Sequence, residues 1–400
     1  LSCGAALHKK NKSFIILEFT DRVGGRIKTE AVENFQLDHG FQVLQTGYPE
    51  ASKLLDFDKL QLKKFPAGVA VRYKGAFHVI ADPRHHPRYL FSPLTSPIGT
   101  LKDRFLMLKL ANEVCRGSID ELFSQPEQPA INFLENWGFS IGFIERFFVP
   151  FFAGACLDPK IKASSHVLKY IFRVFAQGDA ALPSRGMEEI PRQIAESVPV
   201  DSIRYKSAVT HVDDAGVTLK DGSIIRGRTV VLATSQNVIA DFVPDYSALP
   251  SVGESCFYYS ANWRPPFKEP FLLLNGEGRG PINNIAFPSL VAPEYAPPGK
   301  TLVAVVVLGK ENMAQSDIEQ QVRHQCTEWF GSQVEQWKHI HTFRIEHALP
   351  FQKVPTAHPF ETPEPVGKNL RIIGEYQSLP GIQWALLSGR MTAEAIVAQS

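Results

Sequence analysis

The segment from Leu1 to Arg26 constrains the fold of this 400-residue chain more than any other. Residues 1–10 combine small side chains with a basic last turn, which predicts a helix whose C-terminal cations suit the helix dipole. A short apolar strand, Ser13–Leu17, follows and ends at Glu18. This order is typical of the second half of a dinucleotide-binding βαβ unit, in which the acid binds a ribose hydroxyl. Any small-residue helix followed by a parallel strand shows the same pattern.

Two arginines and two glycines follow this acid at close spacing. They are Arg22, Gly24, Gly25 and Arg26. Glycine lets the backbone turn and approach a ligand closely. The guanidinium fork of arginine matches the oxygen atoms of a pyrophosphate. The order E-x3-R-x-GG-R therefore favours a nucleotide site over a generic loop. We expect the first strand and the glycine-rich GxGxxG loop of the unit to precede Leu1.

The C-terminal segment carries a second signal of the same kind. Leu370–Ile373 is predicted to be a strand, and Gly374-Glu375 follows it. A loop then leads through Gly381 to a helix that we expect to run from Trp384 to Ala398. The N-terminus of a helix presents free N–H groups to an anion or a dipole. A terminal βα unit that only packs on a sheet is the alternative.

These motifs resemble the FAD-dependent amine oxidoreductase superfamily, which includes monoamine oxidases, protoporphyrinogen oxidases and phytoene desaturases. The match is carried by residues 18–26 and by the C-terminal unit, and it resumes near Ala208-Val209 and at Thr229–Thr234. In the family the C-terminal acid binds a ribityl hydroxyl, and the helix N-terminus faces the flavin pyrimidine. The resemblance implies non-covalent FAD, bound by Glu18, Arg22, Gly24, Gly25, Arg26, Gly40, Phe41, Val209, Gly374, Glu375, Gly381, Ile382 and Ala385.

The fold class that follows is α/β. We expect a discontinuous Rossmann-like FAD-binding domain of the glutathione-reductase-2 type at residues 1–50, 181–249 and 356–400. Residues 51–180 and 250–355 are predicted to form an interleaved α+β substrate domain with a helical insertion. Strands are expected at 200–205, 208–213, 216–220 and 223–225. The turn Pro183–Met187 resembles the family's P-x-GG-M turn, with Arg185 at the first glycine position.

The catalytic side carries less information. Aligned on the C-terminal helix, the family's flavin-facing lysine falls near Ser255 or Cys256, and a cage tyrosine falls on Gly381. The cysteine that can bond to the flavin falls near Ala357-His358, so covalent FAD is not expected. No residue is assigned as a general base. Phe41 and Trp384 are the side chains that we expect nearest the flavin ring.

The missing amine oxidase residues favour the protoporphyrinogen oxidase and phytoene desaturase branch. The expected activity is oxidation of a C–C or C–N bond of a bulky apolar substrate, with hydride transfer to flavin N5. Such chemistry needs orientation and a dry pocket more than acid–base groups. An amine oxidase and a flavin-binding scaffold that acts through a protein partner remain as alternatives. Substrate, electron acceptor and oligomeric state are left open.

Composition and apolar runs bear on partners and location. The net charge of +1 gives no electrostatic reason to expect nucleic acid. Five scattered cysteines suggest neither disulfides nor a metal site, so no metal is expected, and the cytoplasm or an organelle interior fits best. No signal peptide or membrane span is expected. Phe147–Phe152 are interpreted as core or cavity lining, and also as the candidate contact of a peripheral membrane attachment.

Overall fold

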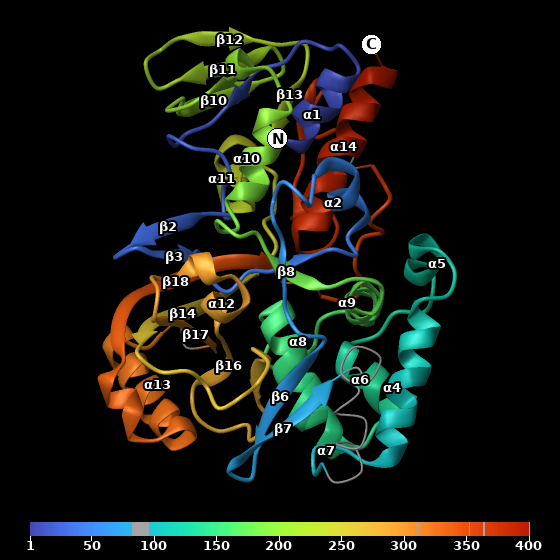
Figure 1. The fold of residues 1–400 in the computed structure, drawn as a ribbon. Helices are drawn as coiled ribbons and strands as arrows, with labels where there is room; N and C mark the ends of the chain where they lie inside the picture. Colours follow the sequence, from blue (N-terminus) through green and yellow to red (C-terminus); the bar gives the residue numbers. More distant parts are fainter. Residues whose placement is uncertain (82–95, 310–311, 352, 363–364, 400) are drawn as a thin grey trace.

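The computed structural model describes the whole chain except residues 82–95, 310–311, 352, 363–364 and 400. Its elements gather into two bodies that the chain crosses several times (Figure 1). One body holds both chain ends, and the other is built on a long mixed sheet. The α/β fold predicted from the sequence is therefore confirmed. The predicted domain boundaries stay a prediction.

The body that holds the chain ends has two short parallel strand pairs. β1 (Ile16–Leu17) pairs with β9 (Ile203–Arg204), and β13 (Val230–Leu232) pairs with β19 (Leu370–Ile372). Three separate stretches of the sequence therefore contribute to this body. The expected strand at 200–205 is wrong in its first half, because Val200–Ser202 form a 3-10 turn. The reason is local: the Ser202 hydroxyl bonds the carbonyl of Pro199 at 2.6 Å.

Two helices from opposite chain ends pack closely beside these strands (Figure 1). α1 (Ser2–Lys9) lies against α14 (Ile382–Ala398). A Cβ atom at Gly389 of α14 would lie 2.9 Å from the backbone nitrogen of Cys3. The Ser2 hydroxyl also donates to the Leu386 carbonyl at 2.7 Å. The small residues of both helices are therefore needed for this close contact.

An antiparallel sheet and two helices complete the upper body in Figure 1. The sheet runs in the order β10 (Val209–Asp213), β11 (Gly216–Leu219) and β12 (Ile224–Arg226), as the turn signals predicted. The helices are α10 (Glu189–Glu196) and α11 (Gln236–Phe242).

The second body is a seven-stranded mixed sheet. Its order is β18 (Lys338–Pro350), β14 (Ser251–Ala261), β17 (Thr301–Leu308), β16 (Ile282–Ala286), β15 (Leu272–Asn275), β6 (Gly68–Tyr73) and β7 (Ala76–Ala81). Only the β15–β6 pairing in this sheet is parallel. β17 is buried along its whole length, and α13 (Gln315–Phe330) packs on the sheet through an apolar face. Short helical segments lie at Pro288–Val291 (α12), Pro293–Tyr295 and Ser332–Gln336.

A helical layer covers the other side of β6 and β7 (Figure 1). It comprises α4 (Leu101–Val114), α5 (Ile119–Phe123), α6 (Ala130–Trp137), α7 (Ile141–Phe143), a π-helical turn at Ile144–Phe148, α8 (Val149–Cys156) and α9 (Ser165–Gln177). Phe147, Phe148 and Phe152 are buried in its core, which confirms the core interpretation. Val149 and Phe151 are only partly buried, and the expected membrane contact at Phe147–Phe152 stays a prediction.

Shorter elements link the two bodies. They are the hairpin β2 (Thr29–Val32) and β3 (Phe35–Asp38), the sheet β4 (Leu44–Gln45), β8 (Ala180–Leu182) and β5 (Lys63–Lys64), and α2 (Pro49–Leu54). All five cysteines are free. In the described part of the chain, no helix combines the length and apolar character needed to cross a membrane.

Candidate cofactor site

The centre of the site is a contact between residues from opposite ends of the chain. The Arg26 guanidinium lies 2.5 Å from Oε1 of Glu375 and also donates to the carbonyl of Ala348 on β18. Oε2 of Glu375 accepts the backbone N–H of Gly381 at 2.5 Å. Glu375 is buried, whereas Arg26 is half-exposed. The structure thus brings together the two motifs from which the sequence predicted a flavin site.

One oxygen of Glu375 is paired only with Arg26. This Oε1 atom is buried and lies 2.5 Å from the guanidinium, without a well-directed hydrogen bond. A ligand hydroxyl that donates to Oε1 would complete the hydrogen bonding of this buried acceptor. This is the chemistry that a ribityl hydroxyl brings to an acid.

The N-terminus of α14 begins beside this acid. Gly381 is its N-cap, with φ 118°, and no side chain caps the helix. A Cβ atom at Gly381 would have no neighbour closer than the Tyr48 hydroxyl at 4.0 Å. Ile382 is half-buried and Ala385 is exposed, whereas Gln383 and Trp384 of the same turn are buried, so packing covers the first turn only in part. The start of a helix is a favourable place for a dipole or an anion.

Arg22 and Arg26 play different roles in the structure. Arg22 lies 3.3 Å from Glu188, a buried acid just before α10, and 3.5 Å from Glu30. Its guanidinium is therefore held by two carboxylates, and Arg26 is the arginine that reaches the centre of the site. Gly24 has φ 124°, and a Cβ atom there would lie 2.3 Å from the carbonyl oxygen of Ile27. Gly25 has φ 59° and open space where a Cβ atom would lie.

Glu18 stands at the other end of the expected cofactor path. Its carboxylate accepts the backbone N–H and the hydroxyl of Thr20, both at 2.8 Å. Its carbonyl accepts the N–H of Ser207 at 2.9 Å, just before half-buried Val209. The acid at the end of β1 and the start of β10 are therefore neighbours, as the resemblance implies.

A buried acid anchors the loop that carries Gly40 and Phe41. Asp38 accepts hydrogen bonds from Thr29 Oγ1 at 2.5 Å, from the Met187 N–H at 2.9 Å and from the Tyr295 hydroxyl at 2.8 Å. Burial raises the pKa of Asp38 to about 6. Through the Met187 hydrogen bond, the turn at Pro183–Met187 is tied to Asp38, two residues before Gly40.

Sequence reasoning missed Glu254, which lies beside the same loop. A Cβ atom at Gly40, whose φ is 86°, would lie 2.0 Å from Oε1 of Glu254. The backbone N–H of Phe41 hydrogen-bonds this carboxylate, but burial dominates and raises its pKa to about 7. The available signal was an acid on the face of a strand that also buries Cys256 and Tyr258.

The two side chains expected nearest the flavin ring differ in their surroundings. Phe41 is half-buried and packs edge-on against Phe65, with ring centroids 6.0 Å apart. Trp384 is 2% exposed and is enclosed by aromatic residues, with Tyr170 at 4.7 Å and Phe123 at 5.7 Å. Phe41 therefore has the more accessible ring.

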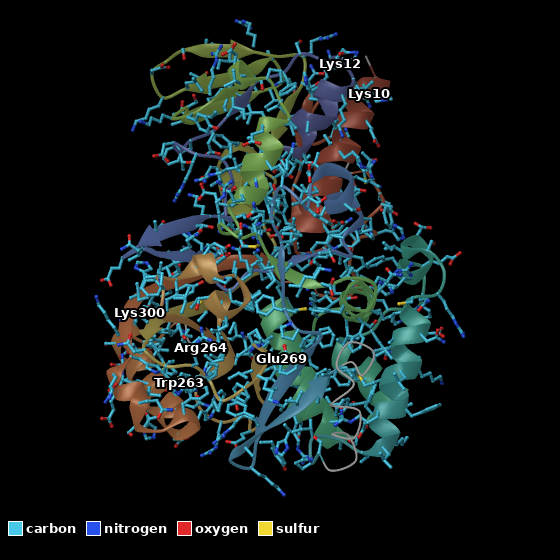
Figure 2. All side chains as sticks on the ribbon, in the orientation of Figure 1. Lys10, Lys12, Trp263, Arg264, Glu269 and Lys300 are labelled. Carbon is cyan, nitrogen blue, oxygen red and sulfur yellow. The ribbon has the colours of Figure 1, made fainter. Side chains whose placement is uncertain are left out.

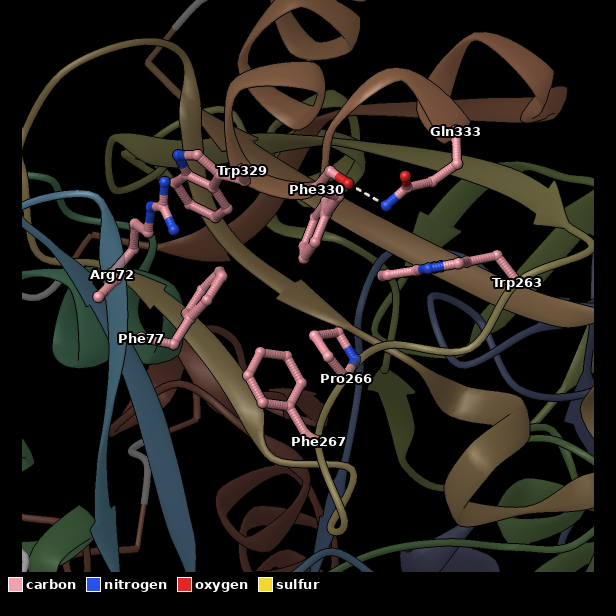
Figure 3. Close-up of a pocket in the computed structure, with 9 residues that line it drawn as sticks. Arg72, Phe77, Trp263, Pro266, Phe267, Trp329, Phe330 and Gln333 are labelled. Carbon is pink, nitrogen blue, oxygen red and sulfur yellow. Dashed lines mark hydrogen bonds between the residues drawn. The ribbon is translucent and has the colours of Figure 1, made fainter.

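An aromatic depression of about 450 Å³ lies elsewhere (Figure 3). Its lining residues are Arg72, Ala76, Phe77, Trp263, Pro266, Phe267, Trp329, Phe330 and Gln333. These residues come from β6, β7, α13 and the segments beside them. Figure 2 places Trp263 in the lower body, far from Lys10 and Lys12 beside α1. None of the lining residues of the depression belongs to the site around Arg26. Among the described residues, no cluster of three or more His, Cys, Asp or Glu is suited to a metal ion.

Comparison with known proteins identifies the fold and the family. Residues 1–397 match the family model described as flavin containing amine oxidoreductase. A putative protoporphyrinogen oxidase from Exiguobacterium sp. 255-15 has 14% identity and a TM-score of 0.74, covering 100% of this chain and 96% of that one. An oxidoreductase from Methanosarcina mazei has 16% identity and a TM-score of 0.73, covering 98% and 97%. Cyclohexylamine oxidase from Brevibacterium oxydans IH-35A has 17% identity and a TM-score of 0.69, covering 100% and 96%. No curated protein matches the chain.

Proposed function

This chain belongs to the flavin-containing amine oxidoreductases and is an FAD-dependent oxidoreductase, and from that premise we propose that it oxidises a C–C or C–N bond of a bulky apolar substrate. The observation that carries the proposal is the contact of Arg26 with Glu375 beside the uncapped N-terminus of α14. This arrangement provides a cation, a buried acid and a helix dipole within one small region.

The residues of the site fit FAD bound without a covalent link. Arg26 is suited to the pyrophosphate, and Glu375 is suited to a ribityl hydroxyl. Gly381 leaves room at the start of α14 for the ring. When bound, FAD supplies a two-electron acceptor, and the protein orients the substrate and tunes that acceptor.

The apolar surroundings of the site support an apolar substrate. Phe41, Val43, Ile345 and Leu349 are partly buried and pack on the main core. Gln42, between Phe41 and Val43, and Ala348, before Leu349, both hydrogen-bond Arg26. These side chains would exclude water from the reacting bond and leave its orientation to shape. A dry site suits oxidation of a substrate that needs little acid–base help.

Amine oxidation is the second candidate. It is favoured by the family description and by the likeness to cyclohexylamine oxidase. Tyr48 and Tyr170 also form a stacked pair near Gly381, with rings 2° from parallel and centroids 6.4 Å apart. This second candidate differs from the first in the substrate that reduces the flavin.

Anaerobic reduction of the FAD-loaded protein tests the proposal. We expect a yellow protein that dithionite bleaches. We also expect polyenes or porphyrinogens to bleach it, because they would donate electrons to the flavin as substrates. Bleaching by amines alone would support the amine oxidase. A protein that takes up no FAD would instead support the scaffold that acts through a partner.

Charge-matched variants separate the site from general effects. Arg26→Gln removes the cation of the site and is expected to weaken FAD binding about tenfold or more. Arg279→Gln removes an exposed cation that pairs with Glu277 in the other body, so it should leave FAD binding unchanged. Equal losses in both variants would contradict the assignment of Arg26.

A further inference from the structure

Glu254 is an acid that the flavin site does not otherwise explain. It lies on β14, opposite Leu308 of β17 and Ile345 of β18, and neither partner carries a charge. The residue is 9% exposed. Among the described residues, none of the ion pairs involves Glu254. An ionised carboxylate in this position is costly because, among the described residues, no cation pairs with it.

The carboxyl group of Glu254 lies directly against the loop that carries Gly40 and Phe41. Its Oε1 atom would collide with any side chain at Gly40, and the Phe41 N–H hydrogen-bonds the carboxylate. Glycine is thus required at position 40 for two reasons: the carboxyl group of Glu254 comes too close for a side chain, and the backbone has a positive φ. A ligand that binds beside Phe41 would therefore lie close to Glu254.

The other ionisable groups around Glu254 lie on its own strand and beside Gly40. Cys256 and Tyr258 share its strand, and burial raises the pKa of both groups well above their ordinary values. Beyond them, Asp38 is hydrogen-bonded to the loop, and its backbone carbonyl accepts the Tyr258 hydroxyl at 2.9 Å. His39, next to Gly40, bonds Glu30 at 2.8 Å.

We propose that Glu254 is a positioning residue whose charge sets how readily the flavin site accepts electrons. The inference rests on the proposed FAD site. Reduction adds two electrons at that site, supplied by the substrate or by dithionite. A nearby carboxylate then gains a proton from solvent, and the only bond formed at Glu254 is its O–H bond. Burial places this proton uptake near pH 7.

Redox titration of the FAD-loaded protein at several pH values tests the inference. We expect the midpoint potential of the wild type to fall more steeply with pH above about 7 than that of Glu254→Gln. At pH 8 the variant should hold about tenfold more reduced flavin at the same applied potential, because it lacks the negative charge. At pH 5.5 the two proteins should agree, since Glu254 is then neutral.

Two further variants make the result specific. Glu254→Asp keeps the charge and should restore the pH dependence, which a purely structural role would not do. It also serves if the Gln variant fails to fold. Glu277→Gln removes an equal charge far from the site and should titrate like the wild type. Identical curves for Glu254→Gln and the wild type would overturn the inference alone, whereas failure of the wild type to bind FAD would overturn the proposed function.

Discussion

Single residues decide where the backbone of the site can go, and adjacent glycines show how. Gly24→Ala places a Cβ atom 2.3 Å from a backbone oxygen at φ 124°, so the loop must move. We expect a loss of roughly 2–4 kcal/mol in the free energy of unfolding. Gly25→Ala meets no neighbour and carries only the left-handed strain of φ 59°, about 1 kcal/mol.

Chemical unfolding of the FAD-free protein measures both effects, and FAD titration separates stability from binding. Gly25→Ala should weaken FAD binding more than its small loss of stability explains, because its Cβ atom would occupy space beside Arg26. Equal stability losses in the two variants would contradict the difference in packing.

The buried acids give the FAD-free protein a characteristic pH dependence. Burial raises the pKa of Glu254 from 4.5 to about 7. The folded state therefore binds more protons than the unfolded state between these values, so this contribution to stability is present below pH 4.5 and is lost as pH rises to about 7. Glu254→Gln should remove a fall of about 3 kcal/mol across this window.

Urea unfolding at pH 4.5 and at pH 8 checks this sign. The variant should gain stability relative to the wild type at pH 8 and not at pH 4.5. Asp38, with a pKa raised to about 6, contributes a fall of the same direction in both proteins and cancels from the comparison. A relative gain at acid pH would show that the carboxylate is stabilised by a partner in the fold.

At the scale of elements, the contact of α1 with α14 depends on one glycine. In Gly389→Ala the new methyl group would lie 2.9 Å from the backbone nitrogen of Cys3 and 3.1 Å from the Cβ atom of Ser2. The helices must separate, and overpacking of this kind costs about 1–3 kcal/mol. Thermal unfolding measures it. Gly227→Ala, whose nearest atom would be 3.5 Å away, is the matched control and should unfold like the wild type.

Elements whose ends have a local cause are those that a sequence can indicate best. Helix α6 ends at Gly138, which takes the left-handed conformation, and α4 begins with a capping box at Thr100 and Asp103. The π-helical turn at Ile144–Phe148 was not predicted, because the apolar spacing of a π turn and of an α-helix is indistinguishable over five residues. A strand was also expected at 200–205, but Val200–Ser202 form a 3-10 turn directly after Pro199.

Only part of the site could be predicted from the sequence, and the reason is physical. Glycines and arginines at fixed spacing identify Arg26 and Glu375 because backbone approach and charge leave a mark in the sequence. Glu254 and Tyr48 leave no such motif, since each enters the site only through contacts between distant segments. Glu254 reaches Gly40 across more than 200 residues by way of the β14–β18 ladder.

At the scale of the whole molecule, the contact of Arg26 with Glu375 joins the first and last parts of the chain. Arg26→Gln leaves the buried Glu375 without its cation and should lower the free energy of unfolding by about 1–2 kcal/mol, a modest figure because Arg26 is 44% exposed. Glu375→Gln removes the charge that needed compensation. The double variant should therefore be more stable than the sum of the single losses predicts.

A double-mutant cycle read by urea unfolding, without FAD and with saturating FAD, tests this link. Without FAD, we expect a coupling of about 1–2 kcal/mol between the two positions. Saturating FAD at one hundred times its dissociation constant should add about 2.7 kcal/mol to the wild type and less to each variant at the same concentration. Additive losses without FAD would mean that the two side chains do not interact in the folded chain. FAD stabilisation that is unchanged in all variants would place the cofactor away from this contact, because a ligand that touches neither group cannot sense their replacement.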